Sequence, residues 1–326
     1  MNIACATDNN YAPYCGIMLT SLFENNKNHS FSVYILSQGL SEEHCSKFDT
    51  LAKRYNSEII IVEIDNTIFS NCRFKEWDYL TVETYYRLLL PTVLPKDMDR
   101  VLYLDCDIIV NHRIDELYMQ DMDNVPLCAC VNIPFCDDLE TRLGIKNEKY
   151  FNCGVLLINL SYWRTNHIFE KCLDIINSIP DKLIYHDQDA LNLLFHCERR
   201  PIKFLDITYN FQTACIKTSE FNDIPDDIKR NICQCAYYPT IIHFISNKKP
   251  WLQICADPYK PRFLYFRRKS LWADTPLQKN YETLRQYLGW QRRLFEVKIG
   301  MRKPWFMTRK ELRKIAKSLS PSYRRG

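Results

Sequence analysis

Short apolar segments alternate with helical segments along most of the chain, and this alternation restricts the fold more than any other feature of the sequence. The strand-like segments are residues 1–7, 31–36, 58–64 and 101–104. The segments between them with helical spacing are residues 15–26 and 41–56. Strands and helices in this order form parallel sheets joined by crossover helices. We therefore predict an α/β fold, with further strands at residues 127–133, 155–160 and 240–244 that continue the sheet and further helices at 162–178 and 188–195.

Polar side chains follow these strands in the positions where open α/β sheets bind ligands, outside the carboxyl ends of the strands. Asp8, Asn10 and Asp105 take such positions. The chain contains four D-x-D pairs, so the spacing alone says little. Only Asp105 and Asp107 directly follow a buried apolar strand, which would hold both carboxylates rigidly at a crevice.

The Asp105 and Asp107 pair suggests a metal site. Two neighbouring carboxylates repel each other unless a cation lies between them. Hard oxygen ligands favour Mg²⁺ or Mn²⁺, and an imidazole ligand shifts the preference toward Mn²⁺. His243, at the end of the apolar segment 240–242, is the candidate imidazole. From the residues alone, an exposed turn for the acidic pair and a structural role for His243 both stay open.

The glycines and cysteines argue against several classes of protein. Seven glycines occur and none form G-x-G-x-x-G, which excludes the usual phosphate-binding loops and disfavours a sugar nucleotidyltransferase. Fifteen cysteines, an odd number without C-x-x-C, fit a reducing cytosol better than a disulfide framework. The first residues do not resemble a signal peptide, and no run of about 18 apolar residues occurs. We expect a cytoplasmic protein that does not span a membrane.

Charge divides the chain after Pro261. Residues 262–326 hold 18 Lys and Arg against 4 Asp and Glu, whereas residues 1–261 hold 25 against 35. Between Trp290 and Phe306 the basic segment interleaves aromatic rings with cations, a mixture that suits an anionic membrane surface. We predict a first domain at residues 1–261 and a membrane-association segment at residues 262–326. A helix packed on the first domain and nucleic-acid binding are the alternatives.

Six motifs in a fixed order then resemble one family. They are residues 6–11 (ATDNNY), 84–88 (TYYRL), 101–107 (VLYLDCD), 151–160 (FNCGVLLINL), 186–189 (HDQD), and His243 followed by residues 249–251 (KPW). Over residues 1–255 the chain resembles the family eight retaining glycosyltransferases of the lipopolysaccharide galactosyltransferase and glucosyltransferase type. The resemblance implies a GT-A nucleotide-sugar-binding fold as the catalytic domain, with a mixed, mostly parallel sheet flanked by helices and a basic helical C-terminal tail.

The resemblance also implies a role for each matching residue. The metal ligands would be Asp105, Asp107 and His243, with Mn²⁺ as the ion and Mg²⁺ as the alternative. The nucleotide would contact Ala6, Asp8, Asn10, Tyr11, Cys106 and, at the diphosphate, Lys249. The donor sugar would contact Arg87, Asn152, Cys153, Gly154, Asp187 and Gln188. The acceptor would contact Asn132, His186 and Ser246.

Two departures from the family pattern concern the approach of the diphosphate, at residue 246, and the acceptor side, at residue 132. Ser246 stands where the family usually has glycine, and Asn132 stands where it often has aspartate. For Arg87, a surface salt bridge is the alternative to a sugar contact, and Trp251 is expected to pack rather than to stack on a sugar.

The resemblance further implies that the reaction retains the configuration of the sugar. Gln188, beneath the reacting face of the sugar, is an amide and a poor nucleophile, so we expect a front-face route, with Asp187 as nucleophile in the alternative. The expected function is transfer of galactose or glucose from a UDP-sugar to a glycan acceptor of lipopolysaccharide or surface polysaccharide, lipid-linked, on the inner face of the membrane. An inactive homologue that binds UDP-sugar or glycan there is the alternative.

Overall fold

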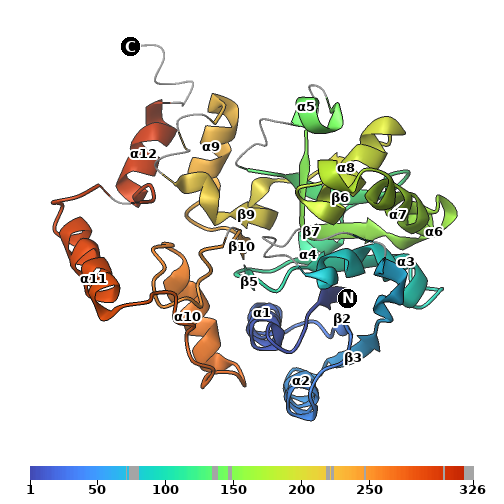
Figure 1. The fold of residues 1–326 in the computed structure, drawn as a ribbon, viewed down its shortest axis with the longest axis horizontal. Helices are drawn as coiled ribbons and strands as arrows, with labels where there is room; N and C mark the ends of the chain where they lie inside the picture. The colour runs from blue at the N-terminus through green and yellow to red at the C-terminus, as the bar shows by residue number, and fades with distance from the viewer. Residues whose placement is uncertain are drawn as a thin grey trace.

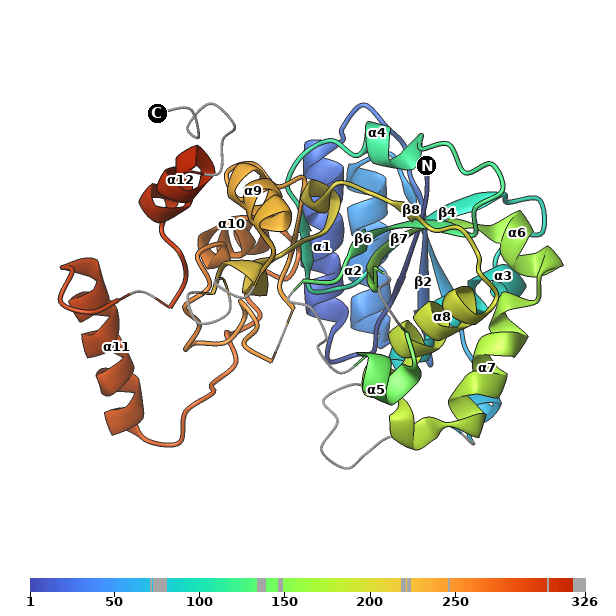
Figure 2. The ribbon, with the colours of Figure 1, turned by 90° about the horizontal axis from the view of Figure 1, so that it is seen from above.

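A central sheet with helices on both faces, and a smaller sheet beside it, form the core of the molecule (Figures 1 and 2). The computed structural model describes residues 1–70, 72, 81–133, 139–145, 149–217, 221, 224–245, 247–303 and 305–318. Within these residues the architecture confirms the predicted α/β fold with a mixed, mostly parallel sheet.

The central sheet has the strand order β3-β2-β1-β4-β7-β6-β8 in the described part of the chain. Its strands are β1 (Asn2–Ala6), β2 (Ser32–Ser37), β3 (Glu58–Glu63), β4 (Arg100–Leu104), β6 (Leu127–Val131), β7 (Phe151–Asn159) and β8 (Lys203–Phe204). β7 is antiparallel to both of its neighbours, and the other pairs are parallel. Because β1 and β4 are parallel neighbours, Asp8 and Asp105 follow them at the same edge of the sheet.

Alternate residues of these strands point to opposite faces of the sheet and build one hydrophobic core on each. α1 and α2 cover one core, and η2, α3, α6, α7 and α8 cover the other (Figure 2). The α-helices are α1 (Ala12–Asn25), α2 (Glu42–Arg54), α3 (Leu90–Val93), α4 (Asp115–Tyr118), α5 (Leu139–Leu143), α6 (Leu160–Thr165), α7 (Ile168–Ser178), α8 (His186–Cys197), α9 (Asp226–Cys235), α10 (Lys260–Lys269), α11 (Leu284–Lys298) and α12 (Arg309–Ser318). The 3-10 helices are η1 (Asn66–Phe69), η2 (Val82–Leu89), η3 (Pro180–Lys182), η4 (Ile207–Asn210) and η5 (Thr213–Ile216).

The segment 240–244 does not continue the central sheet, so that prediction is wrong. It forms β10 (Ile241–His243) in a second sheet of order β5-β10-β9, with β5 (Ile108–Val110) and β9 (Phe211–Gln212). β10 is antiparallel to β5, and His243 is paired with Ile108. β5 is only three residues long and follows β4 after a short turn, which is why no sequence pattern indicated it. This pairing brings His243 next to the acidic motif.

The helix predicted over residues 162–178 is two helices. α6 ends at Thr165 and α7 begins at Ile168. His167 between them has a φ of 53°, in the left-handed region that an α-helix of L-residues does not continue through. Asn159 caps α6 by accepting a hydrogen bond from the Tyr162 amide, so the helix also starts earlier than predicted.

The C-terminal tail is helical, as predicted, and its first part packs against the rest of the molecule. The predicted boundary after Pro261 falls inside α10. Phe263 and Phe266 of α10 share a hydrophobic core with Ile17 of α1. Trp272, 1% exposed, packs in the core beside α1 and α2. Packing therefore extends past residue 261, through Trp272 to Leu277, which packs against the same core as Phe263 and Phe266.

The later helices of the tail differ in how they contact the body. α11 lies apart from the central sheet in both views (Figures 1 and 2) and has no buried residue. α12 packs next to α9 and buries Leu312 in a small core with Ile232. Among the described residues, no helix is both long enough and apolar enough to cross a bilayer. The role of residues 262–326 at a membrane stays a prediction.

Candidate active site

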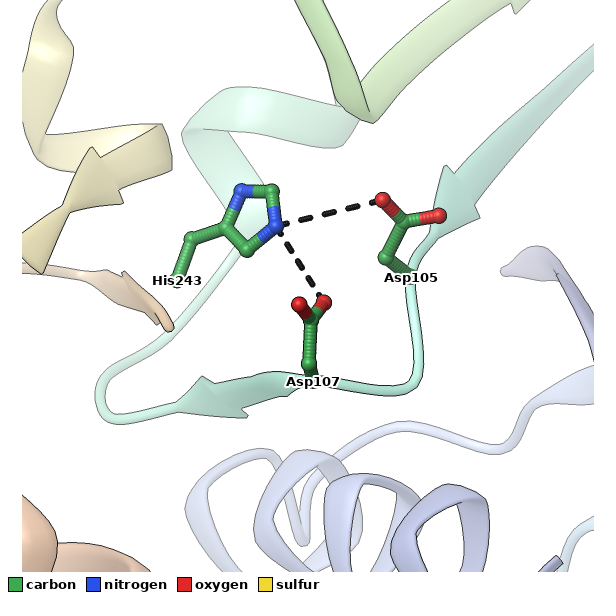
Figure 3. A group of neighbouring side chains, drawn as sticks. All are labelled: Asp105, Asp107 and His243. Carbon is green, nitrogen blue, oxygen red and sulfur yellow. Dashed lines mark ion pairs between the residues drawn. The ribbon is translucent and has the colours of Figure 1, made fainter. Parts of the chain in front are cut away.

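The acidic pair of the 101–107 motif lies in the turn between β4 and β5, and β10 brings His243 to it (Figure 3). His243 Nε2 lies 3.2 Å from Asp107 Oδ1 and 3.9 Å from Asp105 Oδ2. One possible ligand atom from each of the three residues lies within 4.8 Å of the other two. Three such atoms at this spacing could bind one divalent ion.

A hydrogen bond orients the ring of His243. It is made by Nδ1, the ring nitrogen that faces away from the carboxylates. His243 Nδ1 lies 2.8 Å from Asn210 Oδ1, and Asn210 Nδ2 donates to Asn152 Oδ1 at 2.8 Å. An Nδ1–H that donates to Asn210 leaves the Nε2 lone pair directed at Asp105 and Asp107. Two carboxylates and an imidazole in this tautomer form a donor set that suits Mn²⁺ or Mg²⁺. The residues present therefore fit a divalent ion.

Gly154 on β7 makes room for this cluster. The Asp105 amide donates to Gly154 O at 2.9 Å, so the two backbones are in contact. A Cβ atom on Gly154 would lie 2.2 Å from His243 Cε1 and 2.8 Å from Asp105 Oδ2. Both distances are shorter than van der Waals contact, so this approach requires glycine.

Lys249 adds a positive charge beside the cluster. Its Nζ lies 2.5 Å from Asp107 Oδ2 and donates to Phe244 O at 2.9 Å. Burial by itself acts to raise the pKa of Asp107, but the charge of Lys249 and the contact with His243 outweigh it, and the pKa is lowered. Asp107 is thus ionised over the whole physiological range, as a ligand of a cation must be.

Arg87 on η2 connects the acidic pair to α8. Its side chain is 6% exposed, with Nη2 3.0 Å from Asp105 Oδ1 and Nε 2.9 Å from Asp187 Oδ2. It also donates to Cys153 O, and its guanidinium lies 4.5 Å from the centre of the Tyr103 ring. A surface salt bridge for Arg87 is therefore wrong, because a buried guanidinium here has carboxylates on both sides.

Asp187 is buried with an incompletely satisfied carboxylate. Arg87 Nε donates its hydrogen to Thr84 O, so Asp187 Oδ2 has no hydrogen bond among the described residues. Burial raises the pKa of Asp187 to about 7. The positive charge of Arg87 acts to lower this pKa, and the negative charge of Asp105 raises it by a smaller amount. A buried oxygen of this kind is a ready acceptor for a hydroxyl group of a ligand.

Gln188 and Asn152 are held by hydrogen bonds along β7. Gln188 Oε1 accepts from the Cys153 amide at 2.9 Å, and its Nε2 donates to the Tyr150 hydroxyl at 3.2 Å. Asn152 Oδ1 accepts from the Gly154 amide at 2.9 Å. Both carboxamides are therefore fixed in orientation before any ligand binds.

Two cavities with shared walls meet at the acidic pair. The larger, about 520 Å³, is lined by Asp105, Asp107, His243, Arg87, Asn152, Cys153, Gly154, Asp187, Gln188, Lys249 and Asn132, among others. The smaller, about 140 Å³, is lined by Ala6, Asp8, Tyr11 and Cys106, together with Arg87, Asp105, Asp107 and Lys249. The predicted sugar-binding residues thus line one cavity, and most of the predicted nucleotide-binding residues line the other.

Residues 2–255 match the model of glycosyl transferase family 8. The chain belongs to this family. A putative glycosyltransferase of Haemophilus influenzae is 30% identical over 78% of this chain and 74% of its own length. The lipopolysaccharide 1,3-galactosyltransferase of Salmonella typhimurium is 26% identical over 85% of this chain and 80% of its own length.

A solved structure is similar in fold. The crystal structure of galactosyltransferase LgtC in complex with donor and acceptor sugar analogs has a TM-score of 0.72 at 23% identity, covering 89% of this chain and 100% of that chain. This similarity confirms the GT-A fold.

In this family 8 glycosyltransferase, three of the residues predicted to contact the nucleotide lie in one loop after β1. Asp8 Oδ1 accepts from the Tyr11 amide at 2.7 Å, and Asn10 Nδ2 donates to Asp8 Oδ2 at 3.0 Å. Asn10 is exposed and lines neither of the two cavities. Trp251 is 3% exposed and stacks on Tyr14 with the ring centres 3.8 Å apart. Its predicted packing role is therefore confirmed.

The three predicted acceptor residues have different locations. Asn132 lines the larger cavity and accepts from Asn152 Nδ2 at 3.1 Å. His186 is buried, with its Nδ1 3.0 Å from the Tyr85 hydroxyl, and it does not line either cavity described above. Ser246 lies outside the described residues, although its neighbours Ile245 and Asn247 line the larger cavity.

Three residues that position the site were not predicted from the sequence. Tyr103 lies under Arg87, and its place on β4, two residues before Asp105, could have indicated it. Tyr150 holds Gln188, and Asn210 holds His243. Nothing in the local sequence marks Asn210, because its contact with His243 depends on β9 and β10 lying side by side.

Proposed function

We propose that the chain is a retaining, metal-dependent hexosyltransferase that moves galactose or glucose from a UDP-sugar to a glycan acceptor. The observation that carries this proposal is that Asp105, Asp107 and His243 converge at two adjoining cavities. One cavity is lined by the predicted sugar-binding residues and the other by most of the predicted nucleotide-binding residues. The names of two relatives support the choice of hexose: a lipopolysaccharide 1,3-galactosyltransferase and a lipopolysaccharide 1,2-glucosyltransferase of Escherichia coli, 28% identical over 85% of this chain.

The donor would bind across both cavities. The uridine would occupy the smaller one, beside Asp8, Tyr11 and Cys106. The hexose would occupy the larger one, where Asp187 Oδ2 is buried without a hydrogen bond among the described residues. A sugar hydroxyl would supply the hydrogen that this oxygen lacks, and the fixed carboxamide of Asn152 would orient the ring.

The diphosphate would lie at the junction of the cavities. Asp105, Asp107 and His243 would hold Mn²⁺ there, with Mg²⁺ as the alternative ion; when bound, the ion acts as a Lewis acid toward the diphosphate oxygens. Lys249, 2.5 Å from Asp107, places an ammonium group at the same junction. Its charge stabilises the negative charge that UDP gains as it departs.

The proposed reaction takes place on one face of the sugar. The bond between C1 and the diphosphate oxygen breaks, and its electron pair stays with UDP. The acceptor hydroxyl oxygen forms the new bond to C1 from the same face, and its proton passes to a diphosphate oxygen. The positive charge that develops on the sugar faces the carboxamide of Gln188, which two hydrogen bonds hold in place.

The roles of Asp187 and Gln188 can be separated by covalent trapping. Arg87 pairs with the Asp187 carboxylate, which favours a positioning role for Asp187 over that of a nucleophile. We expect no glycosylated peptide when the enzyme is quenched during turnover and digested. A hexose found on Asp187 by mass spectrometry would reject the front-face route.

We further propose that the acceptor is lipid-linked and that the tail holds the enzyme on the inner face of the membrane. α11 supports this, because Leu284, Leu288 and Phe295 are 68%, 56% and 60% exposed and occupy one side of the helix. Residues 262–326 also carry a large excess of Lys and Arg. Apolar side chains with surrounding cations bind anionic bilayers reversibly.

Asp107→Ala tests the function. We expect it to lower transfer from UDP-galactose or UDP-glucose by about 10²–10³-fold, because a stabiliser of the leaving group is lost. Asp123→Ala, an exposed residue of another D-x-D pair, is the matched control and should be as active as the wild type. Calorimetric titration of UDP with and without Mn²⁺ should show metal-dependent binding that Asp107→Ala abolishes.

Two results would contradict the proposal. Full turnover of Asp107→Ala would remove the metal assignment. UDP-sugar binding by the wild type with Mn²⁺, but neither hydrolysis nor transfer on any acceptor, would favour the inactive homologue.

A further inference from the structure

A third cavity lies beside the donor cavity and is formed in part by the C-terminal tail. It has a volume of about 590 Å³, and we call it the tryptophan cavity after Trp290 and Trp305, which line it with Phe306. It shares Ala214, Lys217, Ile245 and Asn247 with the larger cavity of the active site. The two spaces are therefore neighbours with a common wall.

The segment after α11 is attached to the body where this common wall lies. The Met307 amide donates to Ile216 O at 2.8 Å, and Phe306 forms a bridge with Lys217. Trp305 packs against Trp290 with ring centres 4.7 Å apart and the ring planes tilted by 32°, and the Arg293 guanidinium lies 4.2 Å from the Trp305 ring centre. These contacts hold both indole rings at the cavity.

α11 consequently has two sides with different surroundings. Trp290 is half-buried and lines the tryptophan cavity, whereas Leu284, Leu288 and Phe295 are exposed. At 100° per residue, Trp290 lies roughly opposite the stripe formed by these three apolar residues. One side of the helix thus lines a cavity while the other is open to a bilayer.

The remaining walls of the tryptophan cavity carry both apolar and polar side chains, and the polar groups include a buried carboxyl. Asp257 is 8% exposed, and its Oδ1 accepts from the Tyr259 amide at 2.8 Å. Asn280 and Lys248 are further lining residues. An alkyl chain in this space would remove these polar groups from water without replacing their hydrogen bonds, which is costly.

A pyranose ring fits the same walls well. It has apolar C–H faces that pack on indole rings and hydroxyl groups at its edge that bond to carboxylates and amides. We propose that the tryptophan cavity binds a pyranose of the acceptor glycan, one or more residues away from the hydroxyl that is glycosylated. This inference rests on the proposed function, and it assigns acceptor recognition to residues beyond 255, where the match to the family model ends.

The test measures glycan binding separately from donor binding. Saturation-transfer NMR would be recorded on the full chain with methyl glycosides of galactose, glucose and mannose, and with lactose and maltose. We expect at least one to bind with a Kd on the order of 1 mM. Trp290→Ala should weaken this binding at least ~10-fold, a loss of about 1.4 kcal/mol, and Trp305→Ala should do the same. Phe295→Ala, on the exposed side of the same helix, should leave it unchanged.

Each alternative result has a distinct meaning. No saturable binding by any glycan of the panel would overturn the inference, and so would equal binding by the wild type and both tryptophan variants. Binding of octyl glycosides through their alkyl chain, with no binding of the methyl glycosides, would make the cavity a lipid site instead. UDP titration with Mn²⁺ runs in parallel on all variants: its failure in the wild type would count against the proposed function alone.

Discussion

Gly154 allows a strand, a turn and a histidine from the second sheet to approach one another. The space for a Cβ atom at this position is already occupied by the ring of His243 and by an oxygen of Asp105. Neither group can move far, because Asn210 holds His243 and Arg87 holds Asp105. The site geometry is therefore sensitive to a single methyl group.

We predict that Gly154→Ala lowers Mn²⁺-dependent transfer by about 10²–10³-fold, because it displaces His243 or Asp105. Mn²⁺ titration and initial rates would measure the effect. Gly289→Ala is the control, since a Cβ there meets no atom within 4 Å and leaves the site untouched. Equal activity of the two variants would show that the cluster tolerates the added methyl group.

Asp257 provides a pH-dependent test of a buried carboxyl. Burial raises its pKa to about 6, although the Thr213 hydroxyl and the Tyr259 amide donate to it and Lys217 is near. An acid whose pKa is raised on folding favours the folded state most below pH ~4, and this advantage is lost as the pH rises through 6.

Asp257→Asn is therefore expected to change stability in a pH-dependent way. The amide keeps an oxygen for Tyr259 and can donate to Thr213. The variant should unfold like the wild type near pH 4 and be more stable than it at pH 8 by about 2–3 kcal/mol. Urea denaturation at both pH values would measure this, and a stability difference that does not vary with pH would contradict it.

A tight contact joins the first helix to Trp272 of the tail. A Cβ atom on Gly16 of α1 would lie 2.0 Å from Trp272 Cζ3, so the indole ring lies directly on the helix backbone. Trp272 also packs on Phe48 of α2, with ring centres 4.9 Å apart. This contact explains why packing continues beyond the change of charge at Pro261.

A double-mutant cycle would measure this contact. Gly16→Ala should destabilise the protein by about 1–3 kcal/mol through overpacking, and Trp272→Ala by about 3–5 kcal/mol through the cavity it leaves. Because the methyl group fills space that Trp272→Ala vacates, the double variant should lose less than the sum of the two. Strict additivity in thermal or urea unfolding would show that the two residues act independently.

The molecule as a whole separates an acidic body from a basic tail. The body carries the site, and α11 presents apolar side chains away from it. α12, in contrast, buries Leu312 against the body. Truncation of the tail would therefore disturb the fold, and substitutions on α11 are the cleaner test of membrane binding.

We predict that replacing Leu284, Leu288 and Phe295 by Gln lowers binding to phosphatidylglycerol vesicles at least ~10-fold, because their apolar area no longer leaves water. Thermal stability should not change, since α11 has no buried residue. Wild-type binding should also weaken as ionic strength is raised to about 1 M, where the screening length is about 3 Å. Co-sedimentation with the vesicles would measure binding. Met119→Gln, which replaces an exposed apolar residue of the body, is the control. A triple variant that binds the vesicles as well as this control would contradict the membrane role.

Several features of this protein could be predicted from the order of its residues, because they depend on neighbours in the chain. Strands β1 to β4 follow from short apolar segments, and Asp105 and Asp107 stood out among four D-x-D pairs because a buried strand precedes them. Their place at the sheet edge follows from the parallel order of β1 and β4. The six motifs likewise sufficed for the family.

Other features depend on contacts between segments far apart in the chain. The pairing of β10 with β5, the support of His243 by Asn210 and the burial of Arg87 between two carboxylates each require the folded chain. The resemblance also implied an acceptor contact for His186, whose side chain is buried against Tyr85. A hydrogen bond or an ion pair joins atoms that packing brings together, and packing of distant segments leaves no periodic pattern in the residues that take part.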